Sequence, residues 1–189
     1  DVEIQLTGRN QIENAITALE VIRALRNQNV SIPDEAIYQG MRRTVWPGRF
    51  QVLEASPLVI VDGAHNEDAT RRLAENIQTY LQGRPIIGVM GVFKDKAYKT
   101  IIEIMQPYLE YVYTIDLPNK DRTLDRRELV RVLKAQGISA EDCESVEKAL
   151  RKAKKSAKDG QAVLVFGSLS YLGEVIRLEK EIESDRWKM

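Results

Sequence analysis

The feature that most constrains the fold is an alternation of strand patterns and helix patterns from residue 50 to residue 182. Short apolar runs typical of strands lie at 50–55, 58–61, 85–92, 111–115 and 161–166. Helices with apolar side chains at spacings of three and four are predicted at 66–81, 97–105, 125–135, 145–157 and 168–182. This alternation predicts an α/β fold of the Rossmann-like type, with a mainly parallel sheet and helices on both of its faces.

Two details refine the expected sheet. Ser56-Pro57 separates two of the strand patterns, and this predicts a hairpin. Because a hairpin joins antiparallel strands, we expect a mixed sheet. The run at 85–92, PIIGVMGV, is apolar throughout and predicts a strand that is covered on both faces.

The first 44 residues have a different, purely helical pattern. Apolar residues such as Ile12, Ile16 and Leu19 predict a helix over 11–27, with Asn10 as its N-cap, and a shorter helix is predicted from Pro33 to Gly40. We therefore divide the chain into a short helical segment, 1–44, and a Rossmann-like domain, 45–189. Because the chain opens at Asp1 rather than Met, we expect it to be a fragment.

Composition excludes several classes of partner. Lysine plus arginine equals aspartate plus glutamate, 28 each, so no overall field favours nucleic acid or an anionic membrane. No apolar run approaches the roughly 20 residues that a membrane-spanning helix needs. Cys143 is the only cysteine, which excludes an internal disulfide and indicates a cytoplasmic protein.

Candidate ligand-binding residues follow the predicted strands, because ligands of open α/β sheets bind beyond the carboxyl ends of strands. Segments 62–66 and 167–170 each lie between a strand and a helix, where backbone N–H groups and the helix dipole favour a carboxylate or phosphate. Asp62 either accepts hydrogen bonds from a ribose or only stabilises its turn. His65, the only histidine, is either catalytic or structural. Lys94 follows the next strand, in a charged loop that either binds a ligand or is only solvated.

Other candidates precede the sheet. Arg49 follows a Pro-Gly pair, and its guanidinium either binds phosphate in a bidentate way or is an ordinary surface group. Asn10, Gln11 and Asn14 lie near one face at the start of the first helix. Their carboxamides either match the edge of an adenine or only cap the helix.

Several well-known site motifs are absent from the sequence. It contains no glycine-rich loop ending in Gly-Lys-Ser/Thr, no G-x-G-x-x-G after a strand and no nucleophile elbow. It has no cluster of cysteine and histidine that could bind zinc. A self-sufficient kinase, dehydrogenase or hydrolase is therefore disfavoured.

Five motifs carry a resemblance to a known family. In chain order they are GRNQIENA (8–15), WPGRF (46–50), DGAHN (62–66), FKDK (93–96) and FGSLS (166–170). In this order and spacing they resemble the C-terminal half of folylpolyglutamate and dihydrofolate synthases, which belong to the Mur ligase superfamily. The resemblance covers nearly the whole chain and departs from the family pattern at Asn10, where the family has histidine.

The resemblance implies an ADP-forming ligase. ATP phosphorylates a carboxylate of a folate or of dihydropteroate, and the amine of L-glutamate then displaces phosphate to form an amide. By resemblance, Asn14 contacts the adenine of ATP, Arg49 its phosphates and Asp62 its ribose or phosphate region. Asn10, Gln11 and Lys94 are further candidate contacts of ATP. His65 and Ser168 are similar to the residues that position glutamate.

The resemblance also implies what this chain lacks. The phosphate loop and the ligands of Mg²⁺ lie in the family's N-terminal half, so no metal ligand is expected here. Residues 1–44 resemble the helical tail of the preceding ATPase domain, which is the expected protein partner. We therefore expect that the chain alone does not turn over ATP.

Two alternatives remain at this stage. The first is another Mur-type amino-acid ligase, acting on peptidoglycan or cyanophycin precursors, although the DGAHN motif favours the folate branch. The second is a non-catalytic, Rossmann-like binding module.

Overall fold

The chain forms two units that are described separately. The computed structural model describes residues 1–186, with side-chain surroundings up to residue 181. The first unit is Asp1–Arg49, and the second begins at Phe50.

The first unit contains the two predicted helices, α1 (Arg9–Asn27) and α2 (Asp34–Arg43). The N-cap of α1 is Gly8, so the prediction of Asn10 as N-cap was wrong. Gly8 has a φ of 117°, which a glycine adopts without strain, and the helix can therefore begin before Asn10. Arg26 closes the connection between the helices, because its guanidinium donates to the carbonyl of Ile32 and pairs with Asp34 at 2.6 Å.

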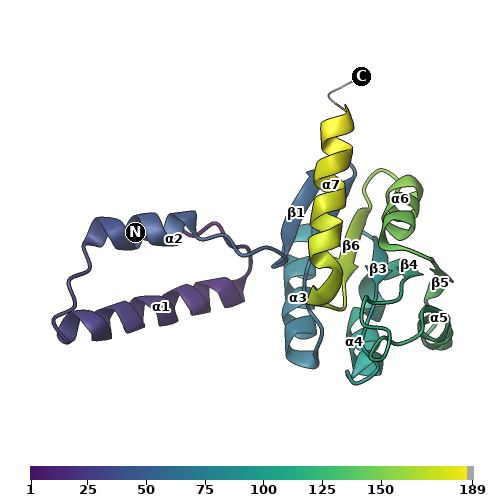
Figure 1. The fold of residues 1–189 in the computed structure, drawn as a ribbon, viewed down its shortest axis with the longest axis horizontal. Helices are drawn as coiled ribbons and strands as arrows, with labels where there is room; N and C mark the ends of the chain where they lie inside the picture. The colour runs from purple at the N-terminus through teal and green to yellow at the C-terminus, as the bar shows by residue number, and fades with distance from the viewer. Residues whose placement is uncertain (187–189) are drawn as a thin grey trace. The chain divides into compact units, whose positions relative to one another are not determined.

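The second unit is built on a six-stranded sheet with the order β1-β2-β6-β3-β4-β5 (Figure 1). The strands are β1 (Gln51–Ala55), β2 (Leu58–Val61), β3 (Ile86–Met90), β4 (Leu109–Thr114), β5 (Ser139–Asp142) and β6 (Ala162–Phe166). Only β1 runs antiparallel to its neighbour, and it pairs with β2 through the predicted Ser56-Pro57 hairpin. The predicted mixed, mainly parallel sheet is confirmed.

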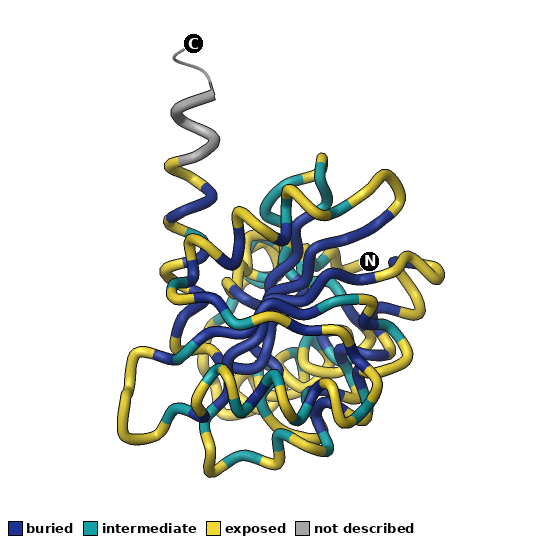
Figure 2. Tube along the Cα trace, turned by 90° about the vertical axis from the view of Figure 1, so that its right-hand side faces the viewer, coloured by how far each residue is buried: buried dark blue, intermediate teal, exposed yellow. Residues whose placement is uncertain are grey.

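Helices cover both faces of this sheet. They are α3 (Glu67–Leu81), α4 (Tyr98–Met105), α5 (Arg126–Ala135), α6 (Val146–Ser156) and α7 (Leu172–Arg186). One apolar core joins α3, α4 and α5 to strand residues such as Ile60 and Leu164. A second core joins α6 and α7 to the alternate residues, such as Val163 and Val165. Because side chains alternate along a strand, the central strands are buried along their whole length, as the continuous dark-blue stretches in Figure 2 show.

Two elements differ from the sequence prediction. Strand β5 was missed because Ser139-Ala140-Glu141-Asp142 has a single buried residue, Ala140, and therefore no apolar run. Its place at the sheet edge comes from backbone pairing with β4. The last helix begins at Leu172 rather than Ser168, because Leu169–Tyr171 forms a short 3-10 turn, η2.

Candidate functional site

The candidate site lies at the edge where the parallel strands end. The strands β2, β3, β4 and β6 run in the same direction, so the segments that follow them meet at one edge of the sheet. These segments contain four of the predicted site residues: Asp62, His65, Lys94 and Ser168.

Asp62 holds the turn that follows β2. One of its carboxylate oxygens accepts from the backbone N–H of Phe50 at 2.9 Å, and the other accepts from Ala64 at 2.8 Å. Phe50 has a φ of 43°, in the left-handed region that a bulky residue rarely adopts. Asp62 is only 8% exposed, and its two hydrogen bonds stabilise this backbone directly. The turn-stabilising role is present in the structure, whereas the contact of Asp62 with a ribose stays a prediction.

The segments after β2, β6 and β3 are in direct contact. The N–H of Gly167 donates to the carbonyl of Ala64 at 3.0 Å. Gly167 has a φ of 106°, and a Cβ at this position would lie 2.6 Å from the carbonyl oxygen of Gly91. Only glycine fits this junction without displacing the backbone.

Ser168 lies next to the junction and is 4% exposed. Its hydroxyl accepts from the N–H of Ser170 and lies 2.9 Å from the Ser170 hydroxyl. Ser168 thereby caps the three-residue 3-10 turn rather than a long helix. The helix α7 begins four residues after Ser168. The segment 167–170 therefore does not form the N-terminus of this helix, although the sequence had predicted that it would.

Tyr171 ties the ends of β3 and β6 together and was not singled out from the sequence. Its hydroxyl lies 2.6 Å from the carbonyl oxygen of Phe166 and 3.1 Å from that of Val89, and it donates to these acceptors. Burial raises the pKa of Tyr171 far above its ordinary value, so the hydroxyl keeps its proton. Nothing in the local sequence pattern marks this tyrosine, because its acceptors lie on two strands.

His65 has a defined tautomer in this arrangement. Its Nδ1 lies 2.8 Å from the carbonyl oxygen of Gly63, and a carbonyl can only accept. Nδ1 therefore carries the proton, and Nε2 of the neutral ring is the acceptor nitrogen. The next residue, Asn66, caps α3 by accepting from Ala69 at 2.9 Å.

The start of α3 is already complemented by acidic groups. Glu67 and Asp68 lie in its first turn and interact favourably with the positive end of the helix dipole. Each of these carboxylates is also paired with an arginine one turn later, Glu67 with Arg71 at 2.8 Å and Asp68 with Arg72 at 3.2 Å. A ligand anion at this helix end would therefore meet charges of both signs.

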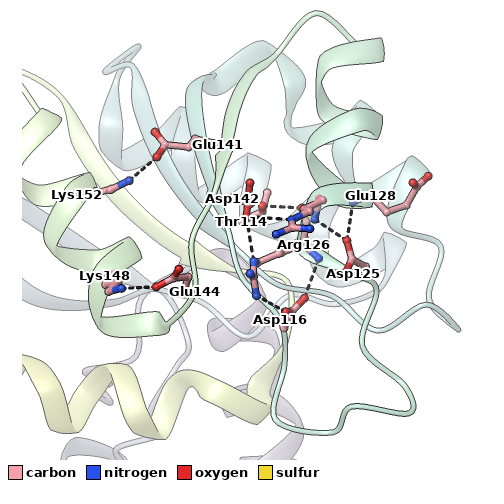
Figure 3. Close-up of polar contacts among 11 residues, drawn as sticks. Thr114, Asp116, Asp125, Arg126, Glu128, Glu141, Asp142, Glu144, Lys148 and Lys152 are labelled. Atoms are coloured by element: carbon pink, nitrogen blue, oxygen red, sulfur yellow. Dashed lines mark hydrogen bonds and ion pairs between the residues drawn. The ribbon is translucent and has the colours of Figure 1, made fainter.

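A charged network surrounds the ends of β4 and β5 (Figure 3). The Arg126 guanidinium donates to Asp116 at 2.8 Å and to Asp142 at 3.0 Å, which raises the pKa of Arg126. Asp125 caps α5 by accepting from the N–H groups of the next helical turn, and these bonds lower the pKa of its carboxyl. Sequence reasoning missed this network, although charged residues directly after two strands were a visible signal.

The remaining predicted residues lie in the first unit. Asn14 donates to Gln11 at 3.1 Å, so these two carboxamides share one face of α1 as predicted. Gln11 is buried, whereas Asn14 is exposed and Asn10 is half-buried. Gln11 and Asn14 line a cavity of about 490 Å³ whose other walls are mainly apolar side chains of α1 and α2. Arg49, half-buried, is the last residue of this unit.

The described part of the chain has neither a candidate metal site nor a membrane-spanning helix. Within it, no group of three or more histidine, cysteine, aspartate or glutamate side chains is placed to hold a metal ion. The carboxylates at the sheet edge are engaged instead with backbone N–H groups or arginines, as for Asp62 and Asp116. None of the described helices is long and apolar enough to cross a bilayer.

The family of the chain is shown by comparison with known protein families. Residues 48–169, more than half of the chain, match the family described as Mur ligase, glutamate ligase domain. The chain therefore belongs to the Mur ligase family. The match includes the predicted residues Arg49, Asp62, His65, Lys94 and Ser168.

Known proteins with the same fold confirm the resemblance to folylpolyglutamate and dihydrofolate synthases. A probable bifunctional folylpolyglutamate synthase/dihydropteroate synthase of Halobacterium salinarum is 35% identical over 91% of this chain and 20% of that protein. The structure of Escherichia coli FolC in complex with DHPP and ADP matches with a TM-score of 0.81 at 27% identity, over 98% of this chain and 41% of that one. The bifunctional folylpolyglutamate synthase/dihydrofolate synthase of Yersinia pestis, complexed with AMPPNP and Mn ion, matches with a TM-score of 0.78 at 30% identity, over 93% of this chain and 40% of that one. This chain spans less than half the length of each.

Proposed function

We propose that the chain is the C-terminal part of an ATP-dependent ligase that adds L-glutamate to a folate or to dihydropteroate. The observation that carries the proposal is the match of residues 48–169 to a glutamate ligase domain, which includes the junction of the segments after β2, β3 and β6. Similarity to an enzyme solved with DHPP and ADP supports the substrate class.

The proposed reaction has two steps. A carboxylate oxygen of the acceptor attacks the γ-phosphorus of ATP, the bond to the bridging oxygen breaks, and ADP leaves. The amine nitrogen of glutamate then attacks the acyl carbon, and phosphate leaves with the amide formed. The acceptor nitrogen of His65 can receive a hydrogen bond from this amine, and the hydroxyl of Ser168 can bind a glutamate carboxylate.

The proposed ATP contacts are those that the resemblance implies, each residue taken by itself. Arg49 is proposed to contact the phosphates, Asp62 the ribose or phosphate region and Asn14 the adenine, with Lys94 as a further contact. The paired carboxamides of Gln11 and Asn14 support the adenine assignment, because together they offer both donors and acceptors beside an apolar cavity. Asn10, at the same helix start, is a further candidate.

The rest of the ligase is assigned the remaining tasks. Mg²⁺ neutralises phosphate charge when bound, and its ligands would come mainly from the N-terminal part. Residues 1–44 are proposed as the helical tail of the central ATPase domain. Exposed apolar side chains of α1, such as Ile12 and Ile16, support this, because they offer a surface for another domain. We expect the enzyme to act in the cytoplasm.

The test compares the whole ligase with this chain alone. ADP release that depends on glutamate is expected for the whole ligase with dihydropteroate or a reduced folate, and no release is expected for the 189-residue chain. His65→Ala is expected to lower kcat/KM for glutamate about 100-fold, and Ser168→Ala to raise the KM for glutamate about tenfold. Ser145→Ala, which removes the cap of α6, is the matched control and should leave both constants unchanged.

Three outcomes would contradict the proposal. Glutamate-dependent ADP release by the chain alone would show that no second part is needed. Turnover of nucleotide-linked peptides instead of folates would move the enzyme to the peptidoglycan branch. Absence of turnover with either acceptor would favour a binding module.

A further inference from the structure

Arg122 contacts three consecutive residues of the segment that follows β3. Its guanidinium carbon lies 4.5 Å from the centre of the Phe93 ring. Its backbone carbonyl accepts from the N–H of Lys94 at 2.8 Å. Its Nη2 lies 2.9 and 3.1 Å from the two carboxylate oxygens of Asp95. One arginine thus binds a ring, a backbone amide and a carboxylate in sequence, although it lies 27 residues further along the chain than Asp95.

The segment that carries Arg122 is itself fixed at several points. The N–H of Leu124 donates to the carbonyl of Val92 at 2.9 Å, next to a backbone bridge between Phe93 and Thr123. The hydroxyl of Thr123 accepts from the N–H of Leu117 at 2.8 Å, which closes the loop on itself. The Arg126 network holds the end of this loop. Arg122 therefore belongs to a loop that several hydrogen bonds hold in place.

Arg122 adds a positive charge next to the segment after β3. Asp95 lies between Lys94 and Lys96, and the Lys96 ammonium is 3.8 Å from its carboxylate. The hydrogen bonds from Arg122 are shorter and two-pronged, and they lower the pKa of Asp95 below its ordinary value. Lys94, Lys96 and Arg122 carry three positive charges against the one negative charge of Asp95, so this group of side chains stays net positive.

We propose that Arg122 is a positioning residue, which fixes the Phe93–Lys96 segment and engages Asp95 so that its lysines can receive an anionic group of a substrate. That group is a carboxylate or a phosphate. The role in turnover rests on the proposed ligase function, whereas the role in holding the segment does not. Arg122 itself does not contact the substrate.

The main experiment measures the KM for glutamate and the KM for ATP separately in the whole ligase. Arg122→Met is expected to raise one of them about tenfold while kcat changes less than about threefold, because an unengaged Asp95 repels the incoming anion. The substrate whose KM rises identifies the group as carboxylate or phosphate. Arg131→Met is the matched control, because Arg131 is an exposed arginine of α5 whose guanidinium pairs with the Glu128 carboxylate at 2.6 Å. Both KM values within about twofold of wild type in Arg122→Met would overturn the proposal.

A charge rescue separates positioning from direct binding and from a merely structural role. Adding Asp95→Asn to Arg122→Met removes the repelling charge and should return the raised KM to within about threefold of wild type. If Arg122 bound the substrate itself, the double variant would stay as impaired as the single one. If Arg122→Met does not fold, Asp95→Asn alone is tested. KM values for glutamate and for ATP within about threefold of wild type support the proposal, and a rise of either value by about tenfold overturns it.

A third measurement separates this proposal from the ligase function. If the wild-type ligase forms no amide, amide hydrogen exchange at Lys94 is measured in the 189-residue chain. Arg122→Met should accelerate this exchange about tenfold or more, because the segment loses its ring and carboxylate contacts, whereas Arg131→Met should not. Equal exchange rates in the two variants would overturn the role of Arg122 while leaving the ligase assignment untouched.

Discussion

The two units differ in how their helices are stabilised. In the first unit, Gln11 is the only buried residue of α1, and α2 has none. In the second unit, α3 alone buries six residues, and the sheet has an apolar core on each face. Both units have helices with apolar residues at regular spacing. Regular apolar spacing therefore predicts a helix, but it does not say whether the same chain supplies the surface that buries the apolar face of that helix.

The largest expected difference between the units concerns buried apolar side chains. Phe166→Ala removes a fully buried ring from the central strand β6 and should lower the free energy of unfolding by about 3–5 kcal/mol. Ile16→Ala removes a side chain that is 55% exposed on α1 and should change it by less than about 0.5 kcal/mol. Urea denaturation of the 189-residue chain, followed by circular dichroism, measures both. Similar losses of unfolding free energy in the two variants would contradict the expected difference between the two units.

Ion pairs should show the next largest contrast. Lys154 is 11% exposed and pairs with Glu54 and Glu179, which are also largely buried. Lys154→Ala leaves two buried carboxylates together and should destabilise the chain by about 3 kcal/mol. In the first unit, Arg26 pairs with an exposed Asp34, and Arg26→Ala should cost only about 1 kcal/mol. The same denaturation experiment decides, and a smaller loss for Lys154→Ala than for Arg26→Ala would contradict this reading of the buried network.

Two glycine substitutions should act in opposite directions. Gly167→Ala places a Cβ 2.6 Å from a backbone oxygen at a φ of 106° and should destabilise the chain by about 2 kcal/mol. Gly40→Ala lies inside α2, where no atom lies within 4 Å of the new Cβ, and should stabilise that helix by up to about 1 kcal/mol. Helicity and the urea midpoint report the two effects. A stabilising Gly167→Ala would show that the junction of the three segments can relax.

Helix caps give the smallest expected contrast. The Ser145 hydroxyl accepts from Lys148 at the start of α6, and Ser145→Ala should lower the free energy of unfolding by about 1 kcal/mol. Asn10 is not the cap of α1, so Asn10→Ala should change it by less than about 0.5 kcal/mol. A loss of about 1 kcal/mol for Asn10→Ala would restore the capping role that the sequence predicted.

Sequence patterns predicted most of the second unit. The strands with apolar runs, the Ser56-Pro57 hairpin and the five long helices are all present. Strand β5 was missed because half of an edge strand faces water and needs no apolar run. The candidate site was predicted in part: the segments of Asp62 and Ser168 lie next to each other, joined by the bond between Ala64 and Gly167. Arg122 was missed because Asp95 lies 27 residues away, and Tyr171 because one of its two acceptors, Val89, lies 82 residues away.

Periodicity and short motifs depend on residues that are near one another along the chain, and they were sufficient to predict the helices, most strands and the enzyme family. The tertiary structure was needed to show that both carboxylate oxygens of Asp62 accept hydrogen bonds from backbone amides, that Gly167 approaches Gly91, and that Arg122 engages Asp95. Each of these needs atoms from separate segments to come within hydrogen-bonding or van der Waals distance. That closeness is created by the packing of the sheet, and no local pattern encodes it.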